Sequence, residues 1–485
     1  MSKFSGRLAY LPAATAEWKF LPFRFERMDE RVLVTNMVGE HLFLREAEFE
    51  AFSEKRLSID SPAFRRLRGK HMLRFTDEEL PLELLAVKTR TRFRYLSEFT
   101  SLHMLVVTLR CEHSCPYCQV SRQSSDKSRY DMSEETAAKA LELIFRSPAS
   151  AIKIEFQGGE PLLNFPLIRF VVQEAERANL VEQRNLAFVI ATNLAMLDDE
   201  ILAFAGEHDI YFSTSLDGPA DLHNENRPRP GGDSWERAVA GIQRVRETLG
   251  PDRVSALMTT TKGSLGRARE IVDSYLEQGF NEIFLRPLSP FGFAIKTKTY
   301  DAYGVEAWLD FYREGLSYIL ELNRQGLAVS ERYAVIVLKK MLTNDDPRYV
   351  DLTSPSGIGI GALVYNYDGN VYVSDEGRML AEDRDDTFKL GNVYEHSYEE
   401  LLLSDALLDP LEQSFTWSVP MCSDCAFEPY CGAAPVFNHA VHGEPVGRKA
   451  ESPFCQRNMA IFKTLLDLYE NDPFARAVFR KWAGL

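Results

Sequence analysis

The sequence lacks any long apolar run. No stretch of its 485 residues approaches the roughly 20 consecutive apolar residues that a membrane-spanning helix needs. Residues 1–10 contain a basic residue but are not followed by the apolar segment of a secretion signal. A surplus of positive charge is also missing, because the formal net charge is -15 at pH 7. We therefore expect a cytoplasmic protein with no nucleic-acid partner and no membrane partner.

Cysteine is scarce, and the seven cysteines cannot all be paired within one chain because their number is odd. A chain of this length also does not need disulfides to hold its core. Clustered thiols in such a chain are interpreted first as metal ligands. They fall into a group of three and a group of four: Cys111, Cys115 and Cys118, then Cys422, Cys425, Cys431 and Cys455.

The middle of the chain alternates strand-like and helix-like segments. Six apolar, β-branched runs are predicted as strands, at residues 104–109, 152–156, 186–192, 210–216, 254–260 and 282–287. Five segments between them have the helical period, at residues 133–145, 167–179, 198–207, 234–248 and 265–278. This order predicts an α/β fold with a parallel sheet covered by helices. The periodicity is compatible with an open sheet or with a barrel.

The flanking segments have a different character. The first 95 residues are predicted as a small α/β unit, with a hairpin at 31–44, helices at 47–53 and 62–72, and a charged linker at 88–94. Further on, Asp368-Gly369 predicts a hairpin with a type I′ turn. We expect two closing helices at 459–469 and 473–482. The expected domains are residues 1–95, 100–300, 301–350 (a helical linker) and 351–485.

The three-cysteine group directly follows the first strand of the repeat. In parallel α/β folds, ligands collect at the carboxyl ends of the strands, so this is a suitable position for a site. Three thiolates are one fewer than the four that usually hold a cubic iron–sulfur cluster, so one iron would stay open for a substrate or cofactor. The alternatives are a zinc site that includes His113, or three free core cysteines.

The CxxxCxxC spacing, with an aromatic residue before the last cysteine, resembles the radical SAM superfamily. The resemblance implies a partial (β/α)6 TIM-like barrel and a [4Fe–4S] cluster whose open iron binds S-adenosylmethionine. It further implies reductive cleavage of that cofactor to a 5′-deoxyadenosyl radical. The residues that the resemblance assigns to the cofactor lie at successive strand ends: Tyr117, Gln157, Gly158, Gly159, Glu160, Asn193, Ser215 and Arg227.

Several of these residues also have simpler interpretations. Gly158 and Gly159 would let the backbone approach a ligand closely, and Glu160 would accept bonds from an ammonium group, but Gly-Gly-Glu-Pro is also an ordinary turn sequence. Tyr117 is expected against the adenine or simply packed in its loop. Arg227 could pair with a carboxylate or cap a helix.

The four-cysteine group can close a site fully, as zinc or as a second [4Fe–4S] cluster. Its spacing resembles the SPASM domain of radical SAM peptide maturases, whose full pattern has seven cysteines and two auxiliary clusters. This chain has Ser374 and Pro435, and no cysteine at 357–361, where the family has ligands of the first auxiliary cluster. We therefore expect an irregular SPASM-like domain with one auxiliary cluster for electron transfer or support. A degenerate cluster held by Ser374 or an aspartate is the alternative.

The resemblance implies a ribosomally made peptide or a protein side chain as the substrate, modified by a crosslink, a thioether or epimerisation. Residues 1–95 loosely resemble an element that binds a leader peptide as an added strand, or they simply pack on the barrel. Residues 21–25, the hairpin and the single auxiliary cluster suggest the His-Xaa-Ser system maturases. An electron donor such as flavodoxin or ferredoxin is implied.

Two other functions stay open at this point. One is a formylglycine-type sulfatase-activating enzyme, and the other is a non-enzymatic iron–sulfur or zinc protein that binds peptide. The sequence names no catalytic residue. Asp217, Tyr365 and Asp375 are polar candidates near the expected cavity, and each is equally consistent with a structural role.

Overall fold

The computed structural model describes residues 17–485 of the chain. Its largest element is an eight-stranded mixed sheet with the order β10-β9-β8-β7-β6-β13-β14-β15. Within the described residues, no helix combines the length and the apolar character needed to cross a membrane. Residues 1–10, in which we expect no secretion signal, lie outside the described part of the chain.

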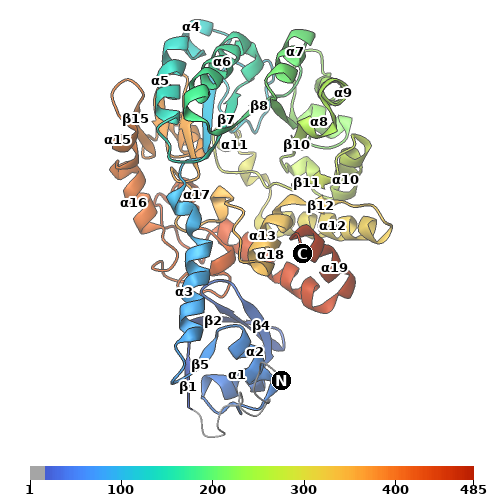
Figure 1. Ribbon diagram of the computed structural model, residues 1–485. Helices are drawn as coiled ribbons and strands as arrows, with labels where there is room; N and C mark the ends of the chain where they lie inside the picture. Colours follow the sequence, from blue (N-terminus) through green and yellow to red (C-terminus); the bar gives the residue numbers. More distant parts are fainter. Residues whose placement is uncertain (1–16) are drawn as a thin grey trace, which may run out of the picture.

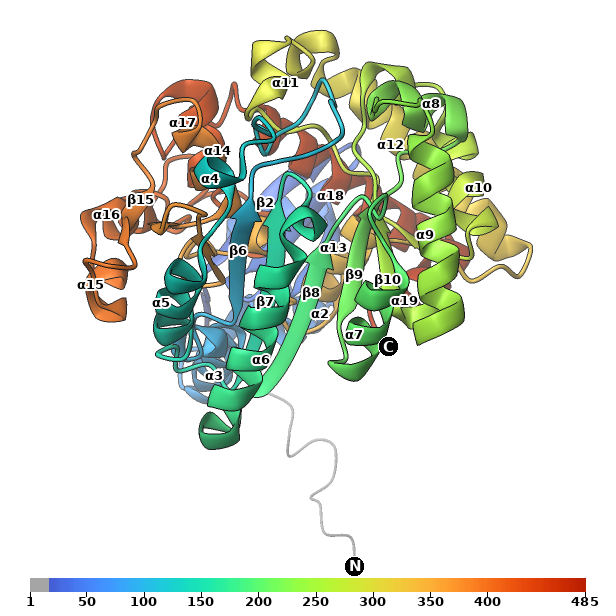
Figure 2. The same ribbon diagram turned by 90° about the horizontal axis from the view of Figure 1, so that it is seen from above.

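Five of the six predicted strands form the parallel half of this sheet. They are β6 (Leu102–Thr108), β7 (Ala151–Gly158), β8 (Asn185–Ala191), β9 (Tyr211–Ser215) and β10 (Val254–Leu257). Figure 2 shows these strands side by side, with helices in front of them. The α/β class and the partial-barrel architecture are therefore confirmed.

All five predicted helices of the repeat are present. They are α5 (Glu134–Ile144), α6 (Phe165–Glu182), α7 (Asp199–Glu207), α9 (Ser234–Leu249) and α10 (Ala268–Glu277). Ser133 and Asp198 accept a backbone N–H at the start of α5 and α7, as N-cap residues do. Two short helices were not predicted, namely α4 (Lys127–Tyr130) and α8 (Ala220–Asn226).

The sixth predicted strand is much shorter than expected. β11 contains only Glu282–Ile283, and it pairs with β12 (Ser330–Glu331) instead of β10. Pro287 and Pro290 lack the N–H groups that a longer strand would need. The segment still closes on the main sheet, because Thr260 donates its N–H to the Arg286 carbonyl over 2.9 Å.

The C-terminal hairpin extends the main sheet on its other side. β13 (Ala362–Tyr365) pairs in parallel with β6, and β14 (Asn370–Tyr372) and β15 (Lys389–Asn392) follow in antiparallel order. The hairpin is confirmed, but the predicted type I′ turn is wrong. That turn needs positive φ at both central residues. Only Gly369 has it, at +83°, and the Gly369 N–H closes the preceding turn on the Asn366 carbonyl.

The N-terminal unit contains a three-stranded antiparallel sheet of β2 (Phe23–Met28), β3 (Arg31–Asn36) and β4 (His41–Arg45). The predicted hairpin corresponds to β3 and β4, while β2 was missed. Helices α1 (Glu46–Ser53) and α2 (Pro62–Gly69) agree with prediction. A small ribbon of β1 (Trp18–Phe20) and β5 (Leu73–Phe75) completes the unit.

The connection from this unit to the barrel is helical. The charged stretch expected as a linker is the end of α3 (Leu80–Arg92), which runs from the N-terminal unit at the bottom of Figure 1 towards the sheet. The remaining helices lie beyond the barrel repeat: α11 (Phe293–Lys296), α12 (Val305–Arg324), α13 (Arg332–Leu342), α14 (Asp375–Ala381), α15 (Tyr398–Leu402), α16 (Asp405–Gln413), α17 (Pro435–His442), α18 (Pro453–Asn471) and α19 (Pro473–Trp482).

The apolar core extends across the predicted boundaries. One cluster runs from the barrel strands to α18 and α19 and also takes in Leu33 and Phe43 of the N-terminal sheet. A second cluster, which includes Val32 and Val34, lies entirely inside the N-terminal unit. Alternate residues of β3 therefore face different cores, as the two-residue period of a strand requires.

Candidate active site

A cavity of about 700 Å³ lies at the carboxyl ends of the parallel strands. All three cysteines of the first group line it. Glu160 does not line it. The other predicted cofactor residues do, namely Tyr117, Gln157, Gly158, Gly159, Asn193, Ser215 and Arg227. The opposite wall comes from the C-terminal half of the chain, with Arg286, Asp351, Asp375 and Glu376.

The loop that carries the three cysteines is held firmly at both ends. Before it, Arg110 makes a bidentate ion pair with Asp131, with N–O distances of 2.6 and 2.8 Å. After it, Gly292 packs so closely that a Cβ atom there would lie 2.9 Å from the Cys118 carbonyl oxygen. Burial raises the pKa of the Cys111 thiol, and it raises the pKa of the Cys115 thiol to about 12.

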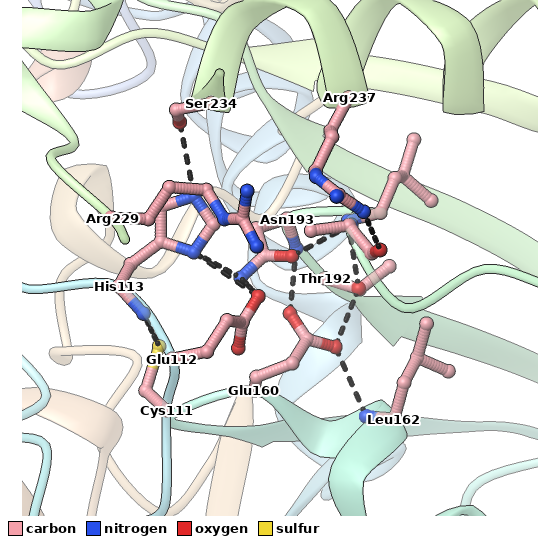
Figure 3. A network of polar contacts seen from close by, with 12 residues as sticks. Cys111, Glu112, His113, Glu160, Leu162, Thr192, Asn193, Arg229, Ser234 and Arg237 are labelled. Carbon is pink, nitrogen blue, oxygen red and sulfur yellow. Dashed lines mark hydrogen bonds and ion pairs between the residues drawn. The ribbon is translucent and has the colours of Figure 1, made fainter. Parts of the chain in front are cut away.

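Two polar residues inside the cysteine loop belong to a buried network (Figure 3). Asn193 donates from Nδ2 to the Glu112 carboxylate over 2.8 Å and lies 2.9 Å from His113 Nδ1. The other ring nitrogen of His113 lies 2.9 Å from the Ser234 hydroxyl at the start of α9. The second Glu112 oxygen, Oε2, is buried and has no hydrogen-bond partner in the described chain. The sequence predicts His113 only as a possible zinc ligand and gives no signal for Glu112.

The close packing around Gly158 and Gly159 explains why both positions are glycine, which the sequence did not reveal. A Cβ atom on Gly158 would overlap the Thr108 carbonyl oxygen, and one on Gly159 would overlap the Arg110 carbonyl oxygen. The Gly159 N–H donates to the Thr108 carbonyl over 2.9 Å. Glycine is therefore required here because the ends of β6 and β7 touch, in addition to any approach of a ligand.

Glu160 does not line the cavity, and Figure 3 shows its carboxylate directed at Thr192, Asn193 and Leu162. It is fully buried, and its carboxylate accepts bonds from the Leu162 N–H, the Thr192 hydroxyl and the Asn193 N–H, at 3.0, 2.6 and 2.9 Å. Burial and the nearby charge of Glu112 raise its pKa to about 8. In this arrangement Glu160 ties the end of β7 to the end of β8.

Tyr117 and Arg227 are joined by Asp217, which is completely buried. The Tyr117 hydroxyl donates to Asp217 over 2.5 Å, and Arg227 donates two bonds of 3.0 and 3.1 Å to the same carboxylate. Burial alone would raise the pKa of Asp217, but the charge of Arg227 holds that pKa below its usual value. Arg227 does pair with a carboxylate bidentately, and that carboxylate belongs to the protein. It also stands at the C-terminal end of α8.

The other polar candidates lie in different surroundings. Tyr365 is fully buried in β13, where its hydroxyl lies 3.2 Å from His103 Nδ1, and it does not line the cavity. Asp375 does line the cavity, and its buried Oδ1 has no hydrogen-bond partner among residues 17–485. Burial raises its pKa to about 6.

The second group of cysteines also comes together. Cys422, Cys425 and Cys431 lie in one loop, and Cys455 lies in the first turn of α18. Burial raises the pKa of each thiol, and Cys422, Cys425 and Cys431 feel a further rise from neighbouring thiols of the group. All seven cysteines are free of disulfides. The first three thiols line one cavity and the other four influence one another's pKa values, so each group offers several sulfur donors for an iron–sulfur cluster.

The positions that depart from the full SPASM pattern have ordinary structural roles. Ser374 caps α14 by accepting the Gly377 N–H over 3.2 Å, and Pro435 is the first residue of α17. Among the other cavity residues, Arg286 lies near the end of the predicted sixth strand, but the sequence assigns it no role. Asp351 and Glu376 reach the cavity because the chain after the barrel folds back over it.

Residues 105–281 match the radical SAM superfamily. A cysteine-type anaerobic sulfatase-maturating enzyme of Clostridium perfringens is 23% identical over 319 residues, which are 63% of this chain and 80% of that enzyme. The radical SAM cyclopropyl synthase TigE of Paramaledivibacter caminithermalis is 26% identical over 156 residues, 30% of this chain and 32% of that protein.

Two solved structures share the fold. Native anSMEcpe with bound AdoMet matches with a TM-score of 0.64 at 19% identity, covering 79% of this chain and 99% of that chain. Streptococcus suis SuiB bound to its precursor peptide SuiA matches with a TM-score of 0.53 at 14% identity, covering 91% and 100%. Residues 105–281 therefore form a radical SAM domain, and the chain that carries this domain is an enzyme.

Proposed function

We propose that the chain modifies a side chain of a ribosomally made peptide or of a protein. Cys111, Cys115 and Cys118 would hold a [4Fe–4S] cluster with one open iron, and Cys422, Cys425, Cys431 and Cys455 would hold a second, fully ligated one. A cluster bound at the first three cysteines, together with S-adenosylmethionine, would supply the reductive cleavage chemistry that allows hydrogen to be taken from the substrate. A flavodoxin or ferredoxin would deliver the electron.

One observation carries this proposal: a single cavity of about 700 Å³ is lined both by the three cysteines and by residues from the C-terminal half of the chain. Clefts of roughly 300–1,000 Å³ suit small ligands and side chains. The donor chemistry fits the group, since all three thiols line this cavity and the ligand atoms of Cys111, Glu112 and His113 lie within 4.8 Å of one another. Gln157, Asn193 and Ser215 offer polar groups around the same space.

Asp375 is the residue that we assign to proton transfer from the substrate. Its raised pKa of about 6 lies near neutral pH, and its Oδ1 accepts no hydrogen bond in the described chain, although Arg378 Nε lies 3.6 Å from it. Asp217 is unsuitable for this role because Arg227 and Tyr117 already occupy its carboxylate. Tyr365 lies outside the cavity.

The N-terminal unit is proposed to bind a leader peptide. β2 and β4 each pair only with β3, which leaves one edge of each strand without a strand partner in the described residues. On α3, Leu80, Leu84 and Val87 form one exposed apolar face, with 63, 43 and 53% of their surfaces accessible. SuiB with its precursor peptide is the matching structure that motivates this assignment. Residues 1–95, 100–300, 301–350 and 351–485 remain our proposed domains.

The experiment is anaerobic reconstitution followed by reaction with S-adenosylmethionine and dithionite. We expect about eight iron atoms per chain and release of 5′-deoxyadenosine. The triple variant Cys111→Ala/Cys115→Ala/Cys118→Ala should keep about four iron atoms per chain. It should release no 5′-deoxyadenosine. A fully reconstituted wild-type protein that yields no 5′-deoxyadenosine would overturn the proposal. The Asp375→Asn variant should release 5′-deoxyadenosine but form no modified peptide.

Sulfatase activation is the second candidate, because the Clostridium perfringens relative is a sulfatase-maturating enzyme. The cysteines missing at Ser374, Pro435 and 357–361 argue against it. A peptide with the CxPxR pattern separates the two functions, since only a sulfatase activator should convert it to formylglycine. Short peptides encoded beside this gene are the natural substrates to test for the first function.

A further inference from the structure

The four-cysteine loop is in direct contact with the N-terminal unit, although some 400 residues separate them in the chain (Figure 1). Arg24 on β2 donates from Nε to the carbonyl of Ser423, which lies between Cys422 and Cys425, over 2.5 Å. The same guanidinium makes a 3.0 Å ion pair with Glu428, which lies between Cys425 and Cys431.

This ion pair is buried on both sides. Only 7% of Arg24 and 5% of Glu428 are accessible. The other Glu428 oxygen accepts the Thr416 hydroxyl over 2.6 Å, so the carboxylate is satisfied only while Arg24 stays in place. Breaking such a pair leaves an uncompensated buried charge, which is strongly unfavourable. The loop therefore depends on a residue from the other end of the chain.

A second set of contacts joins the N-terminal unit to the four-cysteine loop just before Cys431. Tyr430 is fully buried, and its hydroxyl donates to the Gly39 carbonyl over 2.7 Å. Arg92, at the end of α3, donates to the carbonyls of both Val38 and Pro429. A Cβ atom on Gly39, whose φ is +83°, would lie 2.9 Å from the Tyr430 ring, so the turn between β3 and β4 fits the loop closely.

The helix that carries Cys455 is held by the same sheet. Lys463 of α18 pairs with Glu26 over 2.7 Å, and Asp467 pairs with Arg31 over 3.1 Å. On the far side of the loop, Gly432 packs against the backbone of Asp351, a cavity residue. The four-cysteine site thus stands between the N-terminal unit and the wall of the cavity.

We infer that Arg24 is a positioning residue for the four-cysteine site, and that cluster binding there and docking of the N-terminal unit stabilise each other. The inference rests on the proposal that these four cysteines hold a cluster. Because coupling between two equilibria is reciprocal, weakening either one weakens the other. The N-terminal unit is then held in a fixed orientation toward the cavity by the auxiliary site, and is not a freely moving appendage.

The first test measures iron in the full-length reconstituted chain after a fixed exposure to a chelator. Arg24→Met should fall from about eight to about four iron atoms per chain and lose one of the two electron paramagnetic resonance signals of the reduced protein. Arg27→Met is the matched control, because Arg27 lies on the same strand and its partner Glu46 is exposed. The control should keep both signals.

The second test runs in the opposite direction. The Cys422→Ser/Cys425→Ser variant should show at least tenfold faster hydrogen exchange in residues 36–41, the turn that Tyr430 holds, with unchanged exchange in β7 and β8. If Arg24→Met does not fold, Arg24→Lys replaces it. Lysine keeps the charge beside Glu428 but lacks the guanidinium fork that also reaches Ser423, so it should lose the second signal faster than wild type.

The outcomes separate the two proposals. Wild-type protein with about four iron atoms, all lost in the Cys111, Cys115 and Cys118 variant, would overturn the auxiliary cluster and the inference together. Wild-type protein with about eight iron atoms would leave the proposed function standing. In that case the inference fails alone if the Arg24 variants retain both signals and the Cys422→Ser/Cys425→Ser variant shows unchanged exchange in residues 36–41.

Discussion

At the scale of single residues, Asp217 is the buried carboxylate that joins Tyr117 to Arg227. It is completely buried. Its carboxylate accepts hydrogen bonds from the Tyr117 hydroxyl, twice from Arg227, and from the Thr259 N–H over 3.2 Å. Asp217→Asn removes the negative charge and leaves the Arg227 guanidinium buried without a counter-charge. We expect a loss of about 3–5 kcal/mol in the free energy of unfolding, measured by denaturant titration.

Asp221 offers a control a few residues away. It also receives two bonds from one arginine, Arg267, at 2.8 and 3.0 Å, but 70% of its side chain is exposed. Because solvent screens this pair, Asp221→Asn should cost about 1 kcal/mol or less. Equal effects of the two substitutions would contradict the role of burial at Asp217.

Glu331 should make stability depend on pH. It is fully buried at the start of α13, and burial raises its pKa to about 7, against an ordinary value of 4.5. A carboxyl group whose folded pKa is raised favours folding in its protonated form. Its contribution is therefore complete below pH 4.5 and is lost as the pH rises through 7. We expect the apoprotein to lose roughly 3 kcal/mol over this window.

The measurement is the free energy of unfolding of the apoprotein between pH 4.5 and 8, compared with Glu331→Gln. The variant carries no titrating group at this position, so its stability should fall less over the same window. Parallel pH profiles for the two proteins would rule out Glu331 as the source.

At the scale of secondary structure, we expect the contact between the ends of β6 and β7 to be the least tolerant of substitution. A methyl group on Gly158 would overlap the carbonyl oxygen of Thr108, and neither backbone can move without disturbing the parallel pairing. Gly158→Ala should cost at least about 3 kcal/mol, or prevent folding, as judged by thermal unfolding.

Gly69, the last residue of α2, is the matched substitution. A Cβ atom there would meet nothing within 4 Å. Alanine is a better helix former than glycine, so Gly69→Ala should stabilise the chain by up to about 1 kcal/mol. Destabilisation by both substitutions would show that glycine content, and not the contact with Thr108, is what matters.

At the scale of the whole molecule, the N-terminal unit and the C-terminal helices should unfold together. β3 is buried on both faces: Val32 and Val34 pack inside the N-terminal unit, whereas Leu33 packs into the large core. Leu33→Ala should therefore cost about 2–5 kcal/mol. Hydrogen exchange should accelerate in α18 as well as in β2 and β4.

Leu403 is the control for this substitution because 69% of its surface is exposed. Its replacement by alanine should change stability by about 0.5 kcal/mol or less. Faster exchange confined to residues 17–97 in Leu33→Ala would mean that the N-terminal unit unfolds by itself.

The sequence by itself determined the repeating architecture and the positions of the thiols. Strand and helix periods depend on neighbouring residues, so β6 to β10 and the five helices that follow the period could be predicted from the chain. Cys111, Cys115 and Cys118 were recognisable because the ligands of one loop are close in sequence. The same holds for Cys422, Cys425 and Cys431.

Only the tertiary structure decided which groups from distant segments meet. It turned Glu160 inward, gave Arg227 a partner in Asp217, and brought Asp351 and Glu376 to the cavity. It also shortened the sixth strand by pairing it with β12. The contact of Arg24 with Glu428 spans 404 positions, and no local pattern encodes a contact over such a distance. Such pairs are fixed by packing, which depends on every element at once.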